Sequence, residues 1–354
     1  MIYVSVRQMF IRDRVAPVSN RVAEVVNGEP LKVLQHERRF YKVQTPKNQI
    51  GWIDDEAVID DTVYSAFVKL AADHKGDPAV ATATLRDELY MHVLPGRGTN
   101  HFYLLPANTR VQLLARASVS RTPPSASPAA AAPSPAVPHR NVLPVPGLPE
   151  PEPVVMEDWW LARDPQGRTG WLLGSRLDVV APDDIAQYAE GQRIVGAYVL
   201  TRVTDPDSNF PNHEAPEYVT VTAPYESGLP YDFNEVRVFT WSLRHHRYET
   251  AFRLRDIEGF LPVRTGFQPG PDSSYQQVPV FSFEIATGPN VTTDPNTGIT
   301  RPVGPRTIRY EMLDTVVKRV GPDLAPLPST REGEHKPNEE KHKREPARSG
   351  KRRR

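Results

Sequence analysis

The densest group of side chains able to do chemistry lies in residues 244–256. Six consecutive residues read Arg-His-His-Arg-Tyr-Glu, and further arginines follow in the same stretch. Side chains alternate between the two faces of a strand, so Arg247, Arg253 and Arg255 are expected on one face. Such a row could clamp carboxylate or phosphate groups with paired hydrogen bonds. A solvated face whose charges are matched by cross-strand ion pairs is the favoured interpretation.

The sequence contains few of the patterns that catalysis needs. It has no cysteine, which excludes disulfides, thiolate metal sites and cysteine nucleophiles. It has no Gly-x-Ser-x-Gly motif and no glycine-rich phosphate loop. His245 and His246 are adjacent, so on a strand they point apart, and the spacing typical of zinc hydrolases does not occur. We therefore expect no enzyme, no metal and no cofactor, with a hydrolase site in the third domain as the alternative.

An internal repeat is the main signal of domain organisation. Gly51-Trp52-Ile53 matches Gly170-Trp171-Leu172 at an offset of 119 residues. The same offset places the aromatic pair Phe40-Tyr41 over Trp159-Trp160. Two copies that agree in several elements are more specific than either copy alone, so the repeat predicts two related small domains.

An Arg-Asp pair stands near the start of each copy, at Arg12-Asp13 and at Arg86-Asp87. Together with the Gly-Trp elements, this order resembles the bacterial SH3-type domain over residues 3–59 and, with an interruption, 80–180. The resemblance implies two small five-stranded barrels. In each barrel the Arg-Asp pair would begin the first long loop and the Gly-Trp pair would begin the last main strand. Domains of this family are binding modules, often for cell-wall peptides or glycan.

The Gly-Trp pair and the Arg-Asp pair each have a structural interpretation and a binding interpretation. A tryptophan after a strand-opening glycine is more often barrel core than ligand platform, and an Arg-Asp pair at a turn often bonds only the local backbone. Trp159 and Trp160 follow one another in a strand, so they must face opposite ways, and we expect one of them outside the barrel as a binding anchor. The candidate ligand-binding residues of the two barrels are Arg12, Asp13, Trp52, Arg86, Asp87, Trp159, Trp160 and Trp171.

Composition marks the remaining boundaries. Residues 121–153 hold eleven prolines and six alanines, which predicts a disordered insertion in the second barrel. Seven strand-like segments follow near 194–204, 217–223, 235–243, 247–255, 258–263, 278–286 and 306–319. They predict an antiparallel β-sandwich or barrel that resembles no family we can name. The predicted units are a first barrel at 1–59, a linker helix at 60–78, a second barrel at 79–181, a sandwich-like domain at 182–322 and a basic tail at 323–354.

The overall charge and the two ends of the chain indicate which partners the protein binds and in which cell compartment it is found. The 43 basic and 43 acidic side chains argue against specific nucleic-acid binding. Residues 331–354 carry ten Lys or Arg and five Glu, so the tail is expected to be disordered and to contact anionic surfaces weakly. The chain begins on a strand-like pattern without a leader motif. We expect the cell envelope if a leader lies upstream of Met1, and the cytoplasm if Met1 is the true start.

These observations predict an all-β protein with short linking helices. Its expected function is non-catalytic binding of cell-wall material of the peptidoglycan type, or of an envelope protein, through tandem barrels. Besides the hydrolase, an intracellular adaptor is an alternative.

Overall fold

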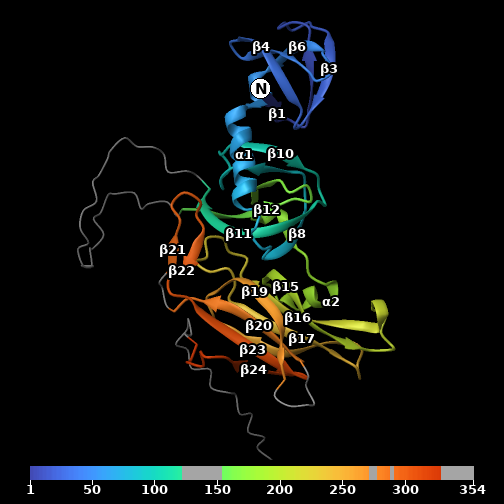
Figure 1. Ribbon diagram of the computed structural model, residues 1–354, viewed down its shortest axis with the longest axis vertical. Helices are drawn as coiled ribbons and strands as arrows, with labels where there is room; N and C mark the ends of the chain where they lie inside the picture. The colour runs from blue at the N-terminus through green and yellow to red at the C-terminus, as the bar shows by residue number, and fades with distance from the viewer. Residues whose placement is uncertain (122–153, 271–276, 288–290, 328–354) are drawn as a thin grey trace, which may run out of the picture.

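The computed structural model describes residues 1–121, 154–270, 277–287 and 291–327 (Figure 1). Three β-rich units follow one another along the long axis, with the N-terminal unit at one end and the C-terminal unit at the other. The fold is all-β, as predicted, and its sheets are antiparallel. None of the helices in the described ranges is long and apolar enough to cross a membrane.

The first barrel is a single sheet whose strand order is β3-β2-β6-β5-β4-β1-β7. Its interior is lined by apolar side chains that alternate along the strands, among them Ile11, Val43 and Ile53. Its strands are β1 (Ile2–Val4), β2 (Gln8–Arg12), β3 (Arg21–Val26), β4 (Pro30–Glu37), β5 (Phe40–Gln44), β6 (Ile50–Asp54) and β7 (Val58–Asp60), with a 3₁₀ turn η1 (Asp55–Ala57).

The second barrel repeats this order as β10-β9-β13-β12-β11-β8-β14. Pairing of the β11–β12 hairpin continues to Ser120 and Met156. The proline-rich residues 122–153 join these two ends and lie outside the described residues. The strands are β8 (Ala81–Leu85), β9 (Leu89–His92), β10 (His101–Leu105), β11 (Arg110–Ser120), β12 (Met156–Arg163), β13 (Thr169–Leu173) and β14 (Leu177–Val179), with a 3₁₀ turn η2 (Gly174–Arg176).

The two Arg-Asp pairs are not equivalent, which corrects the sequence analysis. Arg12 ends β2 and is the Cα partner of Trp52, whereas the corresponding partner of Trp171 is His92. Arg86 and Asp87 instead follow β8, the counterpart of β1, and occupy a short turn rather than a long loop. The match of residue types was misleading because the barrels are related by an offset of 80 residues before the insertion, and the pairs are 74 apart.

Helix α1 (Asp61–Asp73) joins the barrels, as predicted. The Asp60 side chain accepts a hydrogen bond from the backbone N–H of Val63, which caps the helix. Tyr64 stacks on Tyr3 of the first barrel with ring centroids 4.0 Å apart. One turn further, Phe67 is buried among second-barrel side chains such as Phe102.

The third unit is a β-sandwich of two four-stranded sheets, as predicted. The first sheet contains β15 (Arg193–Thr204), β16 (Glu214–Ala223), β17 (Glu235–Ser242) and β18 (Arg247–Leu254). The second contains β19 (Gly259–Pro269), β20 (Gln277–Ile285), β23 (Arg306–Leu313) and β24 (Val316–Val320). The short helical segments are α2 (Asp183–Ala186), η3 (Gln187–Ala189) and η4 (Pro211–His213).

Three features of this unit differ from the prediction. Residues 306–319 form a hairpin rather than one strand, because Asp314 adopts a left-handed φ of 54° at the turn. A hairpin of β21 (Val291–Thr293) and β22 (Thr300–Pro302) was not predicted. Asp323, placed in the tail, pairs with Arg306 at 2.7 Å, so the packed unit extends past residue 322.

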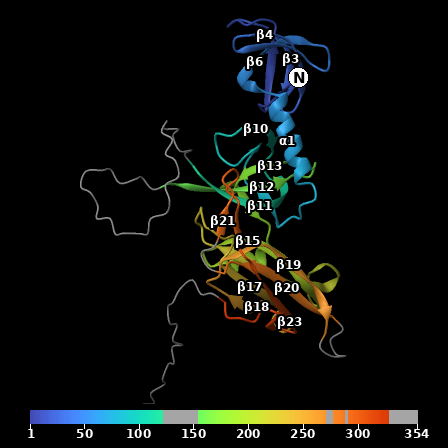
Figure 2. The same ribbon diagram turned by 60° about the vertical axis from the view of Figure 1, so that its left-hand side comes forward.

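The second barrel and the sandwich share one hydrophobic core. Buried side chains of both units, from Phe102 and Trp160 to Phe233 and Phe283, form one contact cluster, whereas the first barrel has its own. Figures 1 and 2 both show the β21–β22 hairpin rising from the sandwich beside β11. There Ala117 pairs with Ile299.

Candidate functional site

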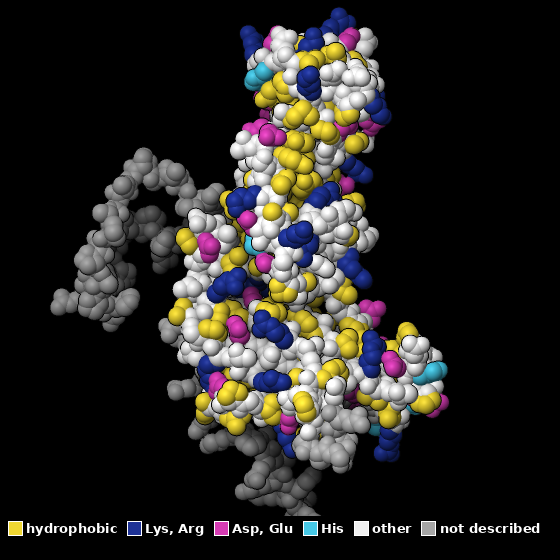
Figure 3. All heavy atoms as spheres, viewed as in Figure 1, with side chains coloured by type: hydrophobic (Ala, Val, Ile, Leu, Met, Phe, Trp, Pro, Cys, Tyr) yellow, Lys and Arg dark blue, Asp and Glu magenta, His cyan; other side chains and the backbone are white. Residues whose placement is uncertain are grey.

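A groove of about 360 Å³ lies on the outer surface of the first barrel. Its walls come from two strand positions named in the sequence analysis, Arg12 and Trp52, which the structure brings together. The other lining residues are Arg14, Val15, Ala16, Pro17 and Phe40. On the face drawn in Figure 3, apolar and basic side chains lie together on this barrel. The groove thus combines an aromatic surface with guanidinium groups.

The Gly-Trp motif explains why Trp52 faces the groove. A Cβ atom on Gly51 would lie 3.0 Å from both the Ile11 side chain and the Arg12 carbonyl oxygen, so only glycine lets β6 cross β2 this closely. Ile53 points into the barrel core, and alternation therefore turns Trp52 outward. The Lys42 ammonium lies 5.9 Å from the Trp52 ring, within range of a cation–π contact.

Asp13 shapes the loop that forms the other wall. Its two carboxylate oxygens accept hydrogen bonds from the backbone and side-chain nitrogens of Asn20, both at 2.9 Å. These bonds, the backbone one foremost, lower the pKa of Asp13. Arg12 donates to the Ser19 hydroxyl at 3.1 Å. Asp13 therefore acts on the backbone of the loop, as the structural interpretation of the Arg-Asp pair had it.

The equivalent surface of the second barrel is closed. Trp159 and Trp171 stand where the first barrel has Phe40 and Trp52, and each is only 2% exposed. They belong to a cluster that includes Leu70 of α1 and Ile299 of the β21–β22 hairpin. The half-buried His92 contacts the Trp159 ring at 5.0 Å, and burial lowers its pKa to about 4.

The expectation of an exposed tryptophan anchor on β12 is therefore wrong. Trp160 packs into the shared core of the second barrel and sandwich, and Trp159 is covered on the opposite face. Trp171 is buried, but outside the barrel rather than in its centre. Of the tryptophans proposed as ligand contacts, Trp52 lines the groove on the outer face of the first barrel, while Trp160, 4% exposed, borders the cleft between the second barrel and the sandwich.

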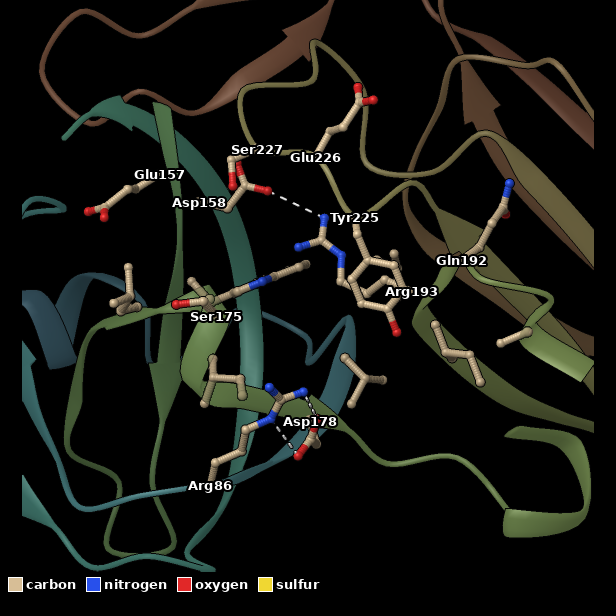
Figure 4. Close-up of a pocket in the computed structure, with 18 of the residues that line it drawn as sticks. Arg86, Glu157, Asp158, Ser175, Asp178, Gln192, Arg193, Tyr225, Glu226 and Ser227 are labelled. Atoms are coloured by element: carbon tan, nitrogen blue, oxygen red, sulfur yellow. Dashed lines mark hydrogen bonds and ion pairs between the residues drawn. The ribbon is translucent and has the colours of Figure 1, made fainter. Parts of the chain in front are cut away.

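Arg86 and Asp87 both form ion pairs. Arg86 donates from Nε and Nη2 to the two oxygens of Asp178, at 2.8 and 2.5 Å. Asp87 accepts from Arg176 at 2.7 Å. Arg86 also borders a cleft between the second barrel and the sandwich (Figure 4).

The predicted row of arginines on β18 does not form. A β-bulge places Thr250 opposite Phe239 and Phe252 opposite Val238, although Phe239 and Val238 face opposite sides of β17. The extra residue reverses the alternation, so Arg253 and Arg255 lie on the other face from Arg247.

The arginines on this face are held by acidic neighbours. Glu235, 2% exposed, accepts from Arg253 at 2.9 Å and from Arg255 at 3.1 Å, and it also pairs with the buried Arg237. Glu190 pairs with the same three arginines. Arg247, separately, lies 3.5 Å from Glu249. These are ion pairs of the kind that the sequence analysis favours for this face.

Other titratable groups gather at one end of the sandwich. Asp205 accepts hydrogen bonds from Trp241 Nε1 at 2.7 Å and contacts His246 Nδ1 at 2.9 Å. Burial raises the pKa of nearby Glu217 to about 7, against a backbone hydrogen bond from Trp241. Within the described ranges, no group of three or more His, Asp or Glu side chains is placed to hold a metal ion.

The groove contains residues that the sequence analysis did not select. Phe40 was noted only as part of the repeat, and Arg14 to Pro17 were treated as loop. The signal available was the apolar run Val15-Ala16-Pro17-Val18 directly after the Arg-Asp pair. Val15, which lines the groove, is 46% exposed, and Val18, the next valine in the same run, is 82% exposed.

Comparison with known proteins identifies the first barrel. The family model of the bacterial SH3 domain matches residues 11–58, from β2 to the start of β7, so the chain contains a bacterial SH3 domain. Membership of the second barrel in the same family stays a prediction, which its identical strand order supports. No curated protein matches the chain. A solved structure of NlpC2 from Trichomonas vaginalis aligns over 86% of this chain and 94% of that chain at 9% identity, with a TM-score of 0.16, too low to indicate a shared fold.

Proposed function

We propose that this chain is a non-catalytic binding protein that recognises cell-wall material of the peptidoglycan type, or an envelope protein, through the groove of its first barrel. The observation that carries the proposal is the open aromatic surface of Trp52 and Phe40 beside Arg12. Aromatic side chains provide large contact areas at low entropic cost, and a guanidinium can pair with a carboxylate. The groove therefore suits a peptide that carries both apolar and carboxylate groups.

The second barrel has a supporting role in this proposal. Its aromatic positions are already occupied by contacts within the chain, so they stabilise the junction with the sandwich instead of meeting a ligand. Binding then depends on one groove rather than on two tandem copies.

Retention on insoluble peptidoglycan tests the proposal. We expect the full chain to be retained at low and high salt, because apolar contacts resist screening. Trp52→Ala should abolish retention, while Phe267→Ala, which removes an exposed aromatic ring from the sandwich, should not. Retention that salt removes would assign binding to exposed charges, and full retention of the Trp52→Ala variant would exclude the groove. If the unaltered chain is not retained at all, the wall ligand is excluded and an envelope protein is the occupant to test.

The hydrolase alternative is tested in the same samples. A wall hydrolase lowers the turbidity of a peptidoglycan suspension, whereas a binding protein leaves it constant. We expect constant turbidity over the pH range in which the protein is folded. A fall in turbidity that Glu217→Gln or Asp205→Asn removed would assign catalysis to the sandwich.

A further inference from the structure

A second cavity lies between the second barrel and the sandwich, away from the groove of the first barrel. It has a volume of about 530 Å³, within the range of small-molecule sites. Arg86, Asp178 and Asp158 line it from the barrel side, and Gln192, Arg193 and Tyr225 line it from the other (Figure 4). Domain junctions are a common location of ligand sites.

The arginines that line this cleft are already paired with carboxylates of the protein. Arg86 and Asp178 form two parallel hydrogen bonds, the strongest arrangement available to these side chains. Asp158, 3% exposed, accepts from Arg193 at 3.3 Å, from Arg116 at 3.2 Å and from the Gly228 backbone at 3.0 Å. A charged ligand would have to compete with these pairs, so the cleft does not favour ions.

Hydrogen-bonding capacity nevertheless remains in the cleft. The Nε atom of Arg193 is enclosed and has no hydrogen-bond partner within the described part of the chain. Arg86 uses Nε and Nη2 for Asp178, which leaves Nη1. The Arg86 and Arg193 side chains are 54% and 25% exposed, so a neutral acceptor such as a hydroxyl can approach their guanidinium groups without disturbing the ion pairs.

An exposed aromatic ring stands at the rim. Tyr225 is 73% exposed and comes from the loop after β16. Its phenol is close enough to Arg86 to contribute to raising the pKa of that guanidinium, although the hydrogen bond to Asp178 is the larger cause. An aromatic face beside hydrogen-bonding groups offers stacking to the C–H face of a sugar ring.

We propose that this cleft binds a neutral oligosaccharide, whose ring stacks on Tyr225 and whose hydroxyls bond Arg193, Arg86 and Gln192. The paired charges select against acidic sugars, because a carboxylate finds no unmatched cation there and meets Asp178 and Asp158. The site does not depend on the groove of the first barrel.

Calorimetric titration of the full chain tests this proposal. The probes are two neutral trisaccharides, maltotriose and N,N′,N″-triacetylchitotriose, and the acidic trigalacturonate. At least one neutral probe should bind at millimolar concentration, and trigalacturonate should bind at least tenfold more weakly. Tyr225→Ala should lower the affinity for the neutral probe at least tenfold, and Phe267→Ala should leave that affinity unchanged.

The outcomes separate this site from the first one. Trp52→Ala should not alter trisaccharide binding. A result that excludes ligand binding in the first-barrel groove therefore leaves this proposal intact, and a result that excludes the cleft leaves the groove proposal intact. Absence of binding by both neutral probes, an unchanged affinity of Tyr225→Ala, or tighter binding of trigalacturonate would each overturn it. Because Tyr225 is exposed, the variant is expected to fold, which a melting curve verifies.

Discussion

Two tryptophans that follow a glycine have opposite surroundings in this protein. Trp52 lines an open groove beside Arg12, while Trp171 is covered by side chains from α1 and from the β21–β22 hairpin. The residue type and its place on the strand are the same in both barrels. What differs is whether another part of the chain packs on that face, and this decides which ring is available to a ligand.

Truncating each ring should therefore give different losses of stability. Trp171→Ala is expected to lower the free energy of unfolding by about 3–5 kcal/mol, because it leaves a cavity in a packed cluster. Trp52→Ala is expected to cost less, about 1–2 kcal/mol, since that ring is only partly buried and lines an open groove. Urea unfolding curves measure both values. Equal losses in the two variants would contradict the assignment of one open and one closed surface.

The buried Glu217 should make stability depend on pH. Its pKa is about 7 in the folded chain and 4.5 ordinarily, so the folded state binds more protons between these values. Its contribution is present below pH 4.5 and is lost as the pH rises to about 7, by up to about 3 kcal/mol.

Glu217→Gln removes that charge and keeps an acceptor for Trp241. The variant should match the parent near pH 4.5 and be more stable by about 1–3 kcal/mol at pH 8. Melting temperatures measured across this range report the difference. A difference that stayed constant with pH would show that Glu217 titrates as an ordinary carboxyl.

At the scale of the elements, a close crossing of two strands shapes each barrel. Glycine at 51 and 170 brings β6 onto β2 and β13 onto β9. A Cβ atom at Gly170 would lie 2.7 Å from the Met91 Cβ, closer than real contacts allow. The crossing also sets the outward direction of the next residue, so one glycine fixes both the packing of the strands and the position of the tryptophan.

Gly170→Ala should accordingly be destabilising, by about 1–3 kcal/mol from overpacking. Gly76 provides the control, because a Cβ atom there meets nothing within 4 Å. Gly76→Ala is expected to be neutral or slightly stabilising. Thermal unfolding of the two variants compares them, and equal midpoints would show that the crossing at Gly170 is not tight.

Elements were predictable from the sequence where local patterns govern them. Alternation located β15, β17 and β20 to within one or two residues, and the linker helix predicted at 60–78 contains α1. The bulge in β18 was not predictable, because nothing local marks Ala251 as the extra residue, and it reverses the face of Arg253. Burial of Trp171 depends on Ile299, 128 residues later in the chain, which no local pattern reports.

At the scale of the whole molecule, the largest hydrophobic cluster of the described residues spans the second barrel and the sandwich, and the first barrel has a cluster of its own. The first barrel has a separate core and is linked through α1 and a few contacts, such as that of Asn27 with Phe102. The second barrel and the sandwich share a core and a buried ionic junction. Arg116 there bonds Asp158, Asp232 at 2.9 Å and the carbonyl oxygens of Leu229 and Tyr231.

Removing Arg116 should reveal these two units. Arg116→Met leaves Asp158 and Asp232 without their main partner, and we expect a loss of about 3–5 kcal/mol for the second barrel and sandwich together. The backbone amides of the first barrel should keep their protection from hydrogen exchange. Hydrogen exchange followed by mass spectrometry separates the units, and uniform loss of protection along the whole chain would contradict two independent cores.

The central claim is that Trp52, in the open aromatic groove of the first barrel, meets the ligand. The protein has five tryptophans, each with one indole N–H signal in a ¹⁵N-labelled sample. Titration with soluble peptidoglycan fragments should shift the Trp52 signal progressively and leave those of Trp159, Trp160 and Trp171 in place. A shift of Trp159 or Trp171 with no change at Trp52 would contradict the account, and so would fragments that bind without moving any indole signal.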